Sequence, residues 1–293
     1  MEILTRIFRR RHKTHQEPSA ATPAATSDIE GSADNWLQSF QTLLALYAQG
    51  INLLRENHLE AALRCFDEAT HLDPRDALLQ TRWPVFGDYE AWGYKGVILY
   101  QLGRFEEAIT CHNTTIEIRP GDCTAWVSKG NCLEAMGRFD EALNCYEKAL
   151  EMSPNNTDGL YARGRTLAKL GRHEDAICSY DRTFQSNVWL DPPDVWTAKG
   201  NSLVALRRYE EAICSYNRAI EGYSKRVDLR PGELFPPLYN KAVAEDELGR
   251  KEDAARSFKK AIEMASDQQA RERDRARSRL VELGVACRDG KNG

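Results

Sequence analysis

The sequence predicts an all-α fold, an α-α superhelix of about six helix–turn–helix units followed by a C-terminal capping helix. Three observations predict it. A seven-residue phrase recurs as GRFEEAI (103–109), GRFDEAL (137–143), GRHEDAI (171–177) and RRYEEAI (207–213). The central Ala residues of all six versions are separated by 46, 34, 34, 36 and 42 residues, a base period of 34 with insertions. Hydrophobic residues make up 42% of the chain, enough to bury a core.

Charge and length exclude several classes of protein. The 293 residues include 40 Lys and Arg against 44 Asp and Glu, a net charge of −4. A chain this close to neutral has no overall basic field, so we expect no nucleic-acid partner. No apolar run reaches the ~18–20 residues that a membrane-spanning helix needs.

The N-terminal region, residues 1–35, is predicted to be a basic arm followed by a flexible linker. Residues 1–13 carry five basic groups, and apolar residues recur at helical spacing. This pattern suits either a solvated tail or an amphipathic helix on an anionic membrane surface, and a targeting segment stays open. Residues 16–35 are rich in Ala, Ser, Thr and Pro and have no hydrophobic period.

The repeats share marker positions beyond the recurring phrase. A large residue opens the first helix, a small residue follows four positions later, and a ring follows the central Ala of the second helix. The large residues are Leu46, Trp92, Trp126, Leu160, Trp196 and Leu238. The small residues are Gly50, Gly96, Gly130, Gly164, Gly200 and Ala242. The rings are Phe66, His112, Tyr146, Tyr180, Tyr216 and Phe258.

This pattern resembles the tetratricopeptide repeat, a 34-residue helix–turn–helix unit, and its wording is similar to bacterial, particularly cyanobacterial, repeat proteins. The resemblance implies six repeats within residues 36–268, followed by a capping helix and tail over 269–293. The repeats are expected at about 43–76, 89–122, 123–156, 157–192, 193–234 and 235–268.

Each marker has a physical reason. We expect Gly130 and Ala142 to leave space where the two helices approach, because a larger residue would force them apart. The Gly of each Gly-Arg phrase suits the left-handed conformation that ends a helix, and Asn57 and Arg207 stand at that position in repeats one and five. Displaced prolines, Pro192 and Pro231, indicate longer second helices or bulged loops in repeats four and five.

Two segments outside the period are interpreted as surface elements. Residues 77–88 form an insertion, whose Trp83 and Phe86 are expected to pack on the surface. In the C-terminal helix, Leu280, Val281 and Leu283 are expected to cover the last repeat.

Cysteines recur close to the ring position, which favours buried, structural thiols over disulfides or metal ligands. They are Cys65, Cys111 and Cys145, one residue before the ring, and Cys178 and Cys214, two residues before it. Reduced thiols are typical of the cytosol, so the predicted location is cytoplasmic, with peripheral membrane association left open.

The sequence shows no catalytic motif: no phosphate loop, no zinc-binding HExxH helix, no nucleophile elbow and no dinucleotide fingerprint. We therefore expect no enzyme, catalytic residue, metal or cofactor. His112 stands where other repeats have an aromatic residue, and we interpret it as a packed core histidine.

The resemblance implies that the working surface is a concave groove lined by the first helix of each repeat. We call this surface the predicted groove. The residues expected to bind a partner there are Tyr94, Val97, Gln101, Asn131, Tyr161, Arg165, Asn201, Tyr239 and Asn240. Val127, Lys169, Thr197 and Asp246 are also expected to face it. Tyr supplies rigid contact area and Asn hydrogen-bonds to a ligand backbone, so this set favours a peptide or helix as ligand.

Two charge patterns have alternative interpretations. Repeats that bind the acidic C-termini of chaperones combine Lys and Asn in successive units, but here Thr197 and Val127 occupy the Lys positions, which disfavours that role. A cation recurs just before the small residue of the first helix, at Lys95, Lys129, Arg163, Lys199 and Lys241. We favour a flanking residue whose stem covers apolar surface over a ladder for an acidic partner.

Together these observations predict a non-catalytic protein–protein interaction scaffold or assembly factor. One alternative is a peripheral membrane adaptor that uses residues 1–13, in assembly of a membrane complex such as a photosynthetic one. A second alternative is a regulatory subunit of an enzyme complex.

Overall fold

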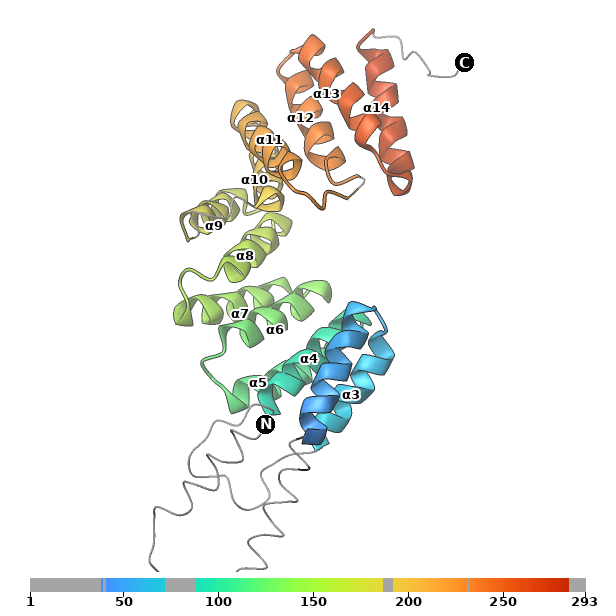
Figure 1. The fold of residues 1–293 in the computed structure, drawn as a ribbon. Helices are drawn as coiled ribbons and strands as arrows, with labels where there is room; N and C mark the ends of the chain where they lie inside the picture. Colours follow the sequence, from blue (N-terminus) through green and yellow to red (C-terminus); the bar gives the residue numbers. More distant parts are fainter. Residues whose placement is uncertain (1–37, 39–40, 72–87, 187–191, 231, 285–293) are drawn as a thin grey trace, which may run out of the picture. The chain divides into compact units, whose positions relative to one another are not determined.

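The computed structural model describes residues 38, 41–71, 88–186, 192–230 and 232–284. The N-terminal arm with residues 1–13, the insertion with Trp83 and Phe86, Pro231 and Cys287 lie outside these residues. The described helices up to α13 (Lys251–Met264) form pairs that follow the chain, and α14 (Ala270–Glu282) follows the last pair (Figure 1). No strand occurs in the described part of the chain, which confirms the predicted all-α class.

The chain divides into two compact units between Lys95 and Gly96. The first unit contains a helix over residues 41–55, α3 (Leu59–His71) and the start of α4 (Asp88–Gln101). The second unit continues from α4 to the end of the described chain.

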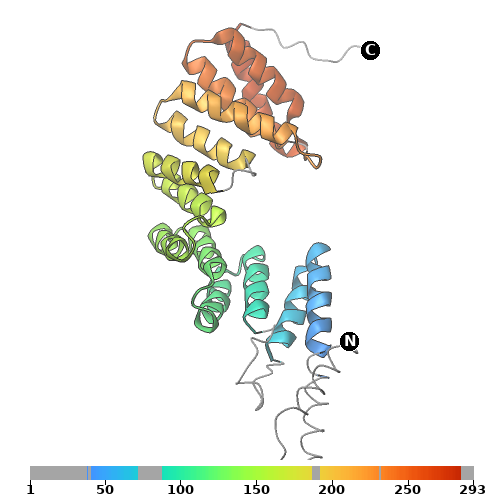
Figure 2. The same cartoon turned by 60° about the vertical axis from the view of Figure 1, so that its left-hand side comes forward.

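The second unit is a row of helix pairs with a closing helix (Figure 2). Its second helices have 14 residues in repeats two to four and six, and 16 in repeat five. The elements are α5 (Phe105–Ile118), α6 (Cys123–Ala135), α7 (Phe139–Met152), α8 (Thr157–Lys169), α9 (His173–Ser186), α10 (Pro193–Ala205), α11 (Tyr209–Ser224), α12 (Phe235–Glu247), α13 (Lys251–Met264), η1 (Asp267–Gln269) and α14 (Ala270–Glu282).

Of the longer helices or bulged loops expected from the displaced prolines, a longer second helix is found in repeat five, at α11; in repeat four the residues that follow α9, 187–191, lie outside the described part of the chain. Consecutive helices pack on one another, and the first helices also touch: α6 contacts α8, α8 contacts α10, and α10 contacts α12.

In repeats one to five, the glycine of the first helix forms a notch for the ring of the same repeat. A Cβ added at Gly130 would lie 2.5 Å from Cε1 of Tyr146, which is fully buried. The same contact recurs at 2.5 Å for Gly164 with Tyr180 and for Gly200 with Tyr216. The space that Gly130 leaves is therefore filled by an aromatic side chain, and not by the neighbouring backbone as the sequence pattern suggested.

Local signals end and begin the helices as expected. Asn57 and Arg207 adopt positive φ angles of 61° and 58°, as the glycines at the same turn do in other repeats. Asp122 caps α6 by accepting hydrogen bonds from the backbone N–H groups of Thr124 and Ala125, at 2.9 and 3.3 Å. Most of these helices therefore end where short-range sequence rules place the end.

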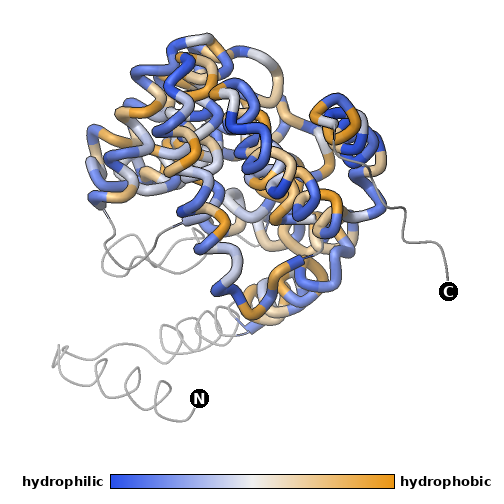
Figure 3. Tube along the Cα trace, turned by 90° about the horizontal axis from the view of Figure 1, so that it is seen from above, coloured by the Kyte–Doolittle hydropathy of each residue, from blue (hydrophilic) through white to orange (hydrophobic). Residues whose placement is uncertain are grey.

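Hydrophobic and hydrophilic stretches alternate along the helices (Figure 3), because each helix buries one side against its neighbours. In α14, Leu280 is buried against the last repeat and Leu283 is partly buried. Val281 is 65% exposed, so the expectation that it covers the last repeat was wrong. It lies one residue, or about 100°, around the helix from Leu280.

Two registers of cysteine behave differently. The residues directly before the ring, Cys65, Cys111 and Cys145, are buried thiols. Those two residues before the ring, Cys178 and Cys214, are exposed free thiols, so the prediction of burial was wrong for them. In the corresponding repeats the buried position is occupied by Ser179 and Ser215, which shows that the small residue next to the ring, and not the cysteine as such, is what recurs.

Candidate interaction surface

The predicted groove residues begin in α4, on both sides of the boundary between the units. In the first unit, Tyr94 stacks on Phe66 with ring centroids 4.9 Å apart and remains 37% exposed. In the second unit, Val97 and Gln101 are exposed. No described contact ties either of these two to the polar residues of later helices.

The polar centre of the second unit lies between α6 and α8. Arg165 on α8 donates from Nε and Nη2 to the two carboxylate oxygens of Glu134 on α6, at 3.0 and 2.6 Å. Lys169 approaches the same carboxylate at 2.8 Å. The Glu134 side chain is only 3% exposed, whereas those of Arg165 and Lys169 are 40% and 50% exposed. A buried carboxylate thus holds two cations whose outer surfaces face solvent.

Electrostatics fix the charge states of this centre. Burial opposes ionisation of Glu134, but the hydrogen bonds from Arg165 and Lys169 outweigh it and hold the pKa of Glu134 below its ordinary value. Burial raises the pKa of Tyr146, whose hydroxyl lies 3.2 Å from the same carboxylate. At neutral pH Glu134 is therefore an ionised acid and Tyr146 a protonated phenol.

Two predicted tyrosines lie half-buried in this surface. Tyr161 on α8 has the Arg165 guanidinium 5.7 Å from its ring centroid and the Tyr180 ring 6.2 Å away. Tyr239 on α12 packs between Phe235 and Phe258, each with a centroid distance of 5.6 Å. Both rings are fixed by packing, which suits a rigid contact surface.

Three predicted asparagines contact one another or a buried tyrosine. Asn131 accepts a hydrogen bond from the Tyr146 hydroxyl at 3.0 Å. Asn201 accepts from the Tyr216 hydroxyl at 2.8 Å and from Nδ2 of Asn240 at 2.8 Å. The structure therefore joins Asn201 on α10 to Asn240 on α12, as it joins Arg165 on α8 to Glu134 on α6.

The other residues expected to face the groove differ in their surroundings. Val127 is only 6% exposed and belongs to the core between α6 and α8, so its assignment to the groove was wrong. Thr197 donates its hydroxyl hydrogen bond to the carbonyl of Pro193 in its own helix. Asp246 pairs with Arg279 of α14 at 2.5 Å.

Sequence reasoning missed Glu134, the residue that organises the centre. It stands at the end of α6, where the equivalent residues of repeats four and five are Ala168 and Val204. Its departure from the uncharged residues of repeats one, two, four and five was the available signal, and repeat six has another acid, Asp246, at the same position. Its two partners lie more than 30 residues away, in the next repeat.

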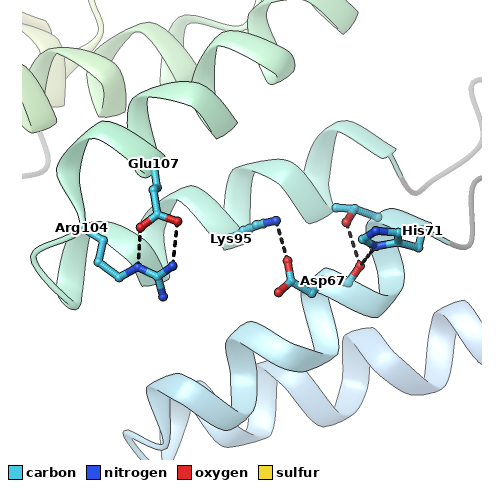
Figure 4. Close-up of polar contacts among 6 residues, drawn as sticks. Asp67, His71, Lys95, Arg104 and Glu107 are labelled. Atoms are coloured by element: carbon cyan, nitrogen blue, oxygen red, sulfur yellow. Dashed lines mark hydrogen bonds and ion pairs between the residues drawn. The ribbon is translucent and has the colours of Figure 1, made fainter.

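The recurrent cations of the first helices have partners within the chain. Nζ of Lys95 lies 2.5 Å from the Asp67 carboxylate (Figure 4). The same figure shows the ion pair of Arg104 with Glu107. Lys199 lies 2.5 Å from Asp181 on α9 and 5.4 Å from the Trp196 ring centroid. These contacts bear out the interpretation of the cations as flanking residues that cover neighbouring apolar surface.

His112 is a packed core histidine, as the sequence indicated. It is 2% exposed, and its ring occupies the notch of Gly96. Burial lowers the pKa of His112 to about 4, against a smaller opposing effect of Asp122. Within the described residues no group of three or more His, Cys, Asp or Glu side chains is arranged to hold a metal ion. In the same part of the chain, no helix combines the length and apolar character required to cross a bilayer.

A row of helix pairs, in which the rings of repeats one to five occupy glycine notches, defines a helical-repeat protein. Family models of the tetratricopeptide repeat match residues 89–122, 124–156 and 145–177. Residues 194–277 match the Domain of Unknown Function DUF3856. Tetratricopeptide repeats are therefore shown within residues 89–177, and this repeat fold is the architecture of a protein-interaction scaffold.

Solved structures share the fold at low sequence identity. YrrB, described as a TPR protein with an unusual peptide-binding site, is 21% identical with a TM-score of 0.52, over 73% of this chain and 97% of its own. TTC0263, a thermophilic TPR protein of Thermus thermophilus, is 21% identical with a TM-score of 0.53, over 67% and 99%. MamA is 19% identical with a TM-score of 0.51, over 62% and 96%. A comparison with curated proteins finds no match.

Proposed function

We propose that this protein is a non-catalytic scaffold that binds a peptide or helix of a partner protein along α6, α8, α10 and α12, the first helices of repeats three to six. The observation that carries the proposal is the surface of these helices. They present half-buried tyrosines, asparagines and an ion-paired arginine that are held by neighbouring helices while part of each side chain stays accessible.

The proposal has support from packing. Side chains fixed before binding lose little conformational entropy when a ligand arrives, and Tyr, Asn and Arg are residue types that contribute strongly to protein recognition. The binding residues proposed in this unit are Asn131, Tyr161, Arg165, Asn201, Tyr239 and Asn240. The peptide-binding site described for YrrB is consistent with this use of the fold.

A paired-variant purification tests the proposal. The groove variant combines Asn131→Ala, Tyr161→Ala and Asn201→Ala on the first helices. The control variant combines Asn144→Ala, Cys178→Ala and Asn217→Ala, three exposed positions on second helices. We expect specific proteins to co-purify with wild type and the control and to be lost from the groove variant, with circular dichroism showing equal helix content. Identical partner sets for the two variants would contradict recognition by this surface.

A further inference from the structure

The chemistry of the ring covaries with the residue that follows the small residue of the first helix, which we call the post-notch position. In the three repeats whose ring is Tyr146, Tyr180 or Tyr216, the post-notch residue is polar. In the three whose ring lacks a hydroxyl, it is aliphatic. From repeat one to six the post-notch residues are Ile51, Val97, Asn131, Arg165, Asn201 and Val243. A hydroxyl at the buried ring thus accompanies a polar side chain on the adjacent first helix, and its absence accompanies an aliphatic one, in all six repeats.

In two of the three tyrosine repeats, a hydrogen bond gives this covariation a physical cause. The Tyr216 hydroxyl donates to Oδ1 of Asn201 at 2.8 Å, and the Tyr146 hydroxyl donates to Oδ1 of Asn131 at 3.0 Å. Each ring is locked in its glycine notch, so its hydroxyl is fixed in space. The two donors are also durable, because burial raises the pKa of both phenols.

Each of these two hydrogen bonds uses the Oδ1 acceptor of an asparagine side chain, and the Nδ2 donor of the same side chain takes no part in it. Among the described residues, Nδ2 of Asn131 and Nδ2 of Asn201 have no hydrogen-bond partner, and Asn201 is exposed. In repeat four, between these two asparagines, Arg165 donates from Nε and Nη2 to the buried carboxylate of Glu134. Its Nη1 group takes no part in these two hydrogen bonds. In the central post-notch row of repeats three to five, the carbonyl oxygens of Asn131 and Asn201 therefore accept hydrogen bonds within the protein, and the amide groups of both asparagines and Nη1 of Arg165 are left as donors.

We propose that Tyr146 and Tyr216 are positioning residues, whose hydroxyls orient Asn131 and Asn201 so that the central row offers only N–H groups to an extended peptide through its backbone carbonyl oxygens. This inference rests on the proposed function and names the chemistry of its ligand. A helical ligand uses its own carbonyl groups internally, whereas an extended segment leaves them free. Val97 and Val243, in repeats two and six, flank the donor row with aliphatic side chains.

The first test needs no ligand. Tyr216→Phe removes only the hydroxyl, and Phe258 shows that this position accepts Phe in repeat six. Tyr180→Phe is the matched control, because its repeat has Arg165, and no asparagine, at the post-notch position. We expect the Asn201 side-chain amide signals in ¹H–¹⁵N NMR spectra, assigned with Asn201→Asp, to shift and exchange faster in Tyr216→Phe and to stay unchanged in Tyr180→Phe. Unchanged Asn201 signals in Tyr216→Phe would overturn the positioning role.

The second test measures binding. The probe is a peptide selected against the full chain from a random 12-residue phage library, and retained only when the groove variant of the preceding section loses it. We expect Tyr216→Phe to weaken its binding about three- to tenfold, the effect of one hydrogen bond, and Tyr180→Phe to change it less than about twofold. Tyr146→Phe should have a smaller effect than Tyr216→Phe, because the Tyr146 hydroxyl also lies 3.2 Å from Glu134.

A helix-stapled form of the same peptide distinguishes the two ligand conformations. We expect it to bind at least about tenfold more weakly than the linear form; equal binding would overturn the extended backbone. Equal loss in Tyr216→Phe and Tyr180→Phe would overturn the positioning role while leaving the proposed function standing. If selection yields no peptide that depends on the groove residues, the proposed function fails, and the ligand chemistry inferred here fails with it.

Discussion

Repeats two and three place different rings in the same notch. In repeat three Tyr146 fills the space beside Gly130, and in repeat two His112 fills the space beside Gly96, each with a ring atom 2.5 Å from where a Cβ would lie. Tyr146 extends past the notch to Asn131 and Glu134, whereas the post-notch residue of repeat two is the aliphatic Val97. The glycine notch therefore fixes where the ring packs in both repeats. Whether the ring carries a hydroxyl decides whether it contacts polar side chains of the first helix.

The largest expected difference between these repeats is their response to acid. The pKa of His112 is about 4 in the folded protein and about 6.5 when unfolded, so the unfolded chain binds the extra proton between these values. Stability supplied by the neutral ring is complete above the unfolded pKa and is lost as the pH falls, by about 2 kcal/mol at pH 5 and about 3 kcal/mol at pH 4. We expect His112→Phe to remove this loss in urea unfolding between pH 7 and pH 4. If the free energy of unfolding falls equally with pH in wild type and in the variant, the low pKa of His112 is not the cause of the acid sensitivity.

The notch itself gives the next effect. Gly130→Ala places a methyl group against the Tyr146 ring and should lower the free energy of unfolding by about 1–3 kcal/mol, despite the better helix propensity of Ala. Gly93, in the same type of first helix, has nothing within 4 Å of an added Cβ. Gly93→Ala should therefore raise the free energy of unfolding by about 0.5–1 kcal/mol. Thermal denaturation of both variants measures the difference, and a change of the same sign in both would refute the notch.

A smaller effect is expected for Glu134, the buried carboxylate of repeat three. Glu134→Gln weakens the hydrogen bonds to Arg165 and Lys169, and because both cations are about half exposed, we expect a loss of about 1–2 kcal/mol. The control Glu141→Gln breaks an exposed pair with Arg138 and should have a smaller effect on stability than Glu134→Gln. Denaturant unfolding at low and high salt separates the two, since only the exposed pair is strongly screened. Equal losses in both variants would count against Glu134 as the organising group.

The smallest effect is expected from the two exposed thiols. Maleimide should modify Cys178 and Cys214 rapidly in the native protein, and Cys65, Cys111 and Cys145 only after unfolding. Because the first two lie at the surface, their modification should change the free energy of unfolding by less than about 0.5 kcal/mol. Mass spectrometry of native samples after short labelling identifies the modified sites. Early labelling of Cys145 would show that the packing beside its ring is loose.

Much of the fold follows from short-range patterns. The 34-residue period, the small residue and the ring identify the helix pairs, and the positive φ angles of Asn57 and Arg207 occur where the phrase predicts a turn. The predictions of burial were wrong where a shift of one residue along a helix separates a buried position from an exposed one. Cys178 and Val281 each lie next to a buried position, and a shift of one residue rotates a side chain about 100° around a helix.

The candidate surface was less accessible to sequence reasoning. Asn131, Arg165 and Asn201 were recognised as surface residues, but Glu134 was not, since its role depends on cations in the following repeat. Val127 was assigned to the surface by its repeat position and lies in the core. Repeat positions describe an average unit, while burial at one position depends on the side chains of its particular neighbours.

The sequence alone determined the class of fold, the order of the helix pairs and the turns between them, because these depend on spacings within one repeat and on the backbone preferences of single residues. Only the tertiary structure decided which polar groups form hydrogen bonds within the protein and which do not. That decision depends on hydrogen bonds across helices, such as those from Tyr216 to Asn201 and from Arg165 to Glu134, which form only when packed rings and helices bring the atoms within about 3 Å.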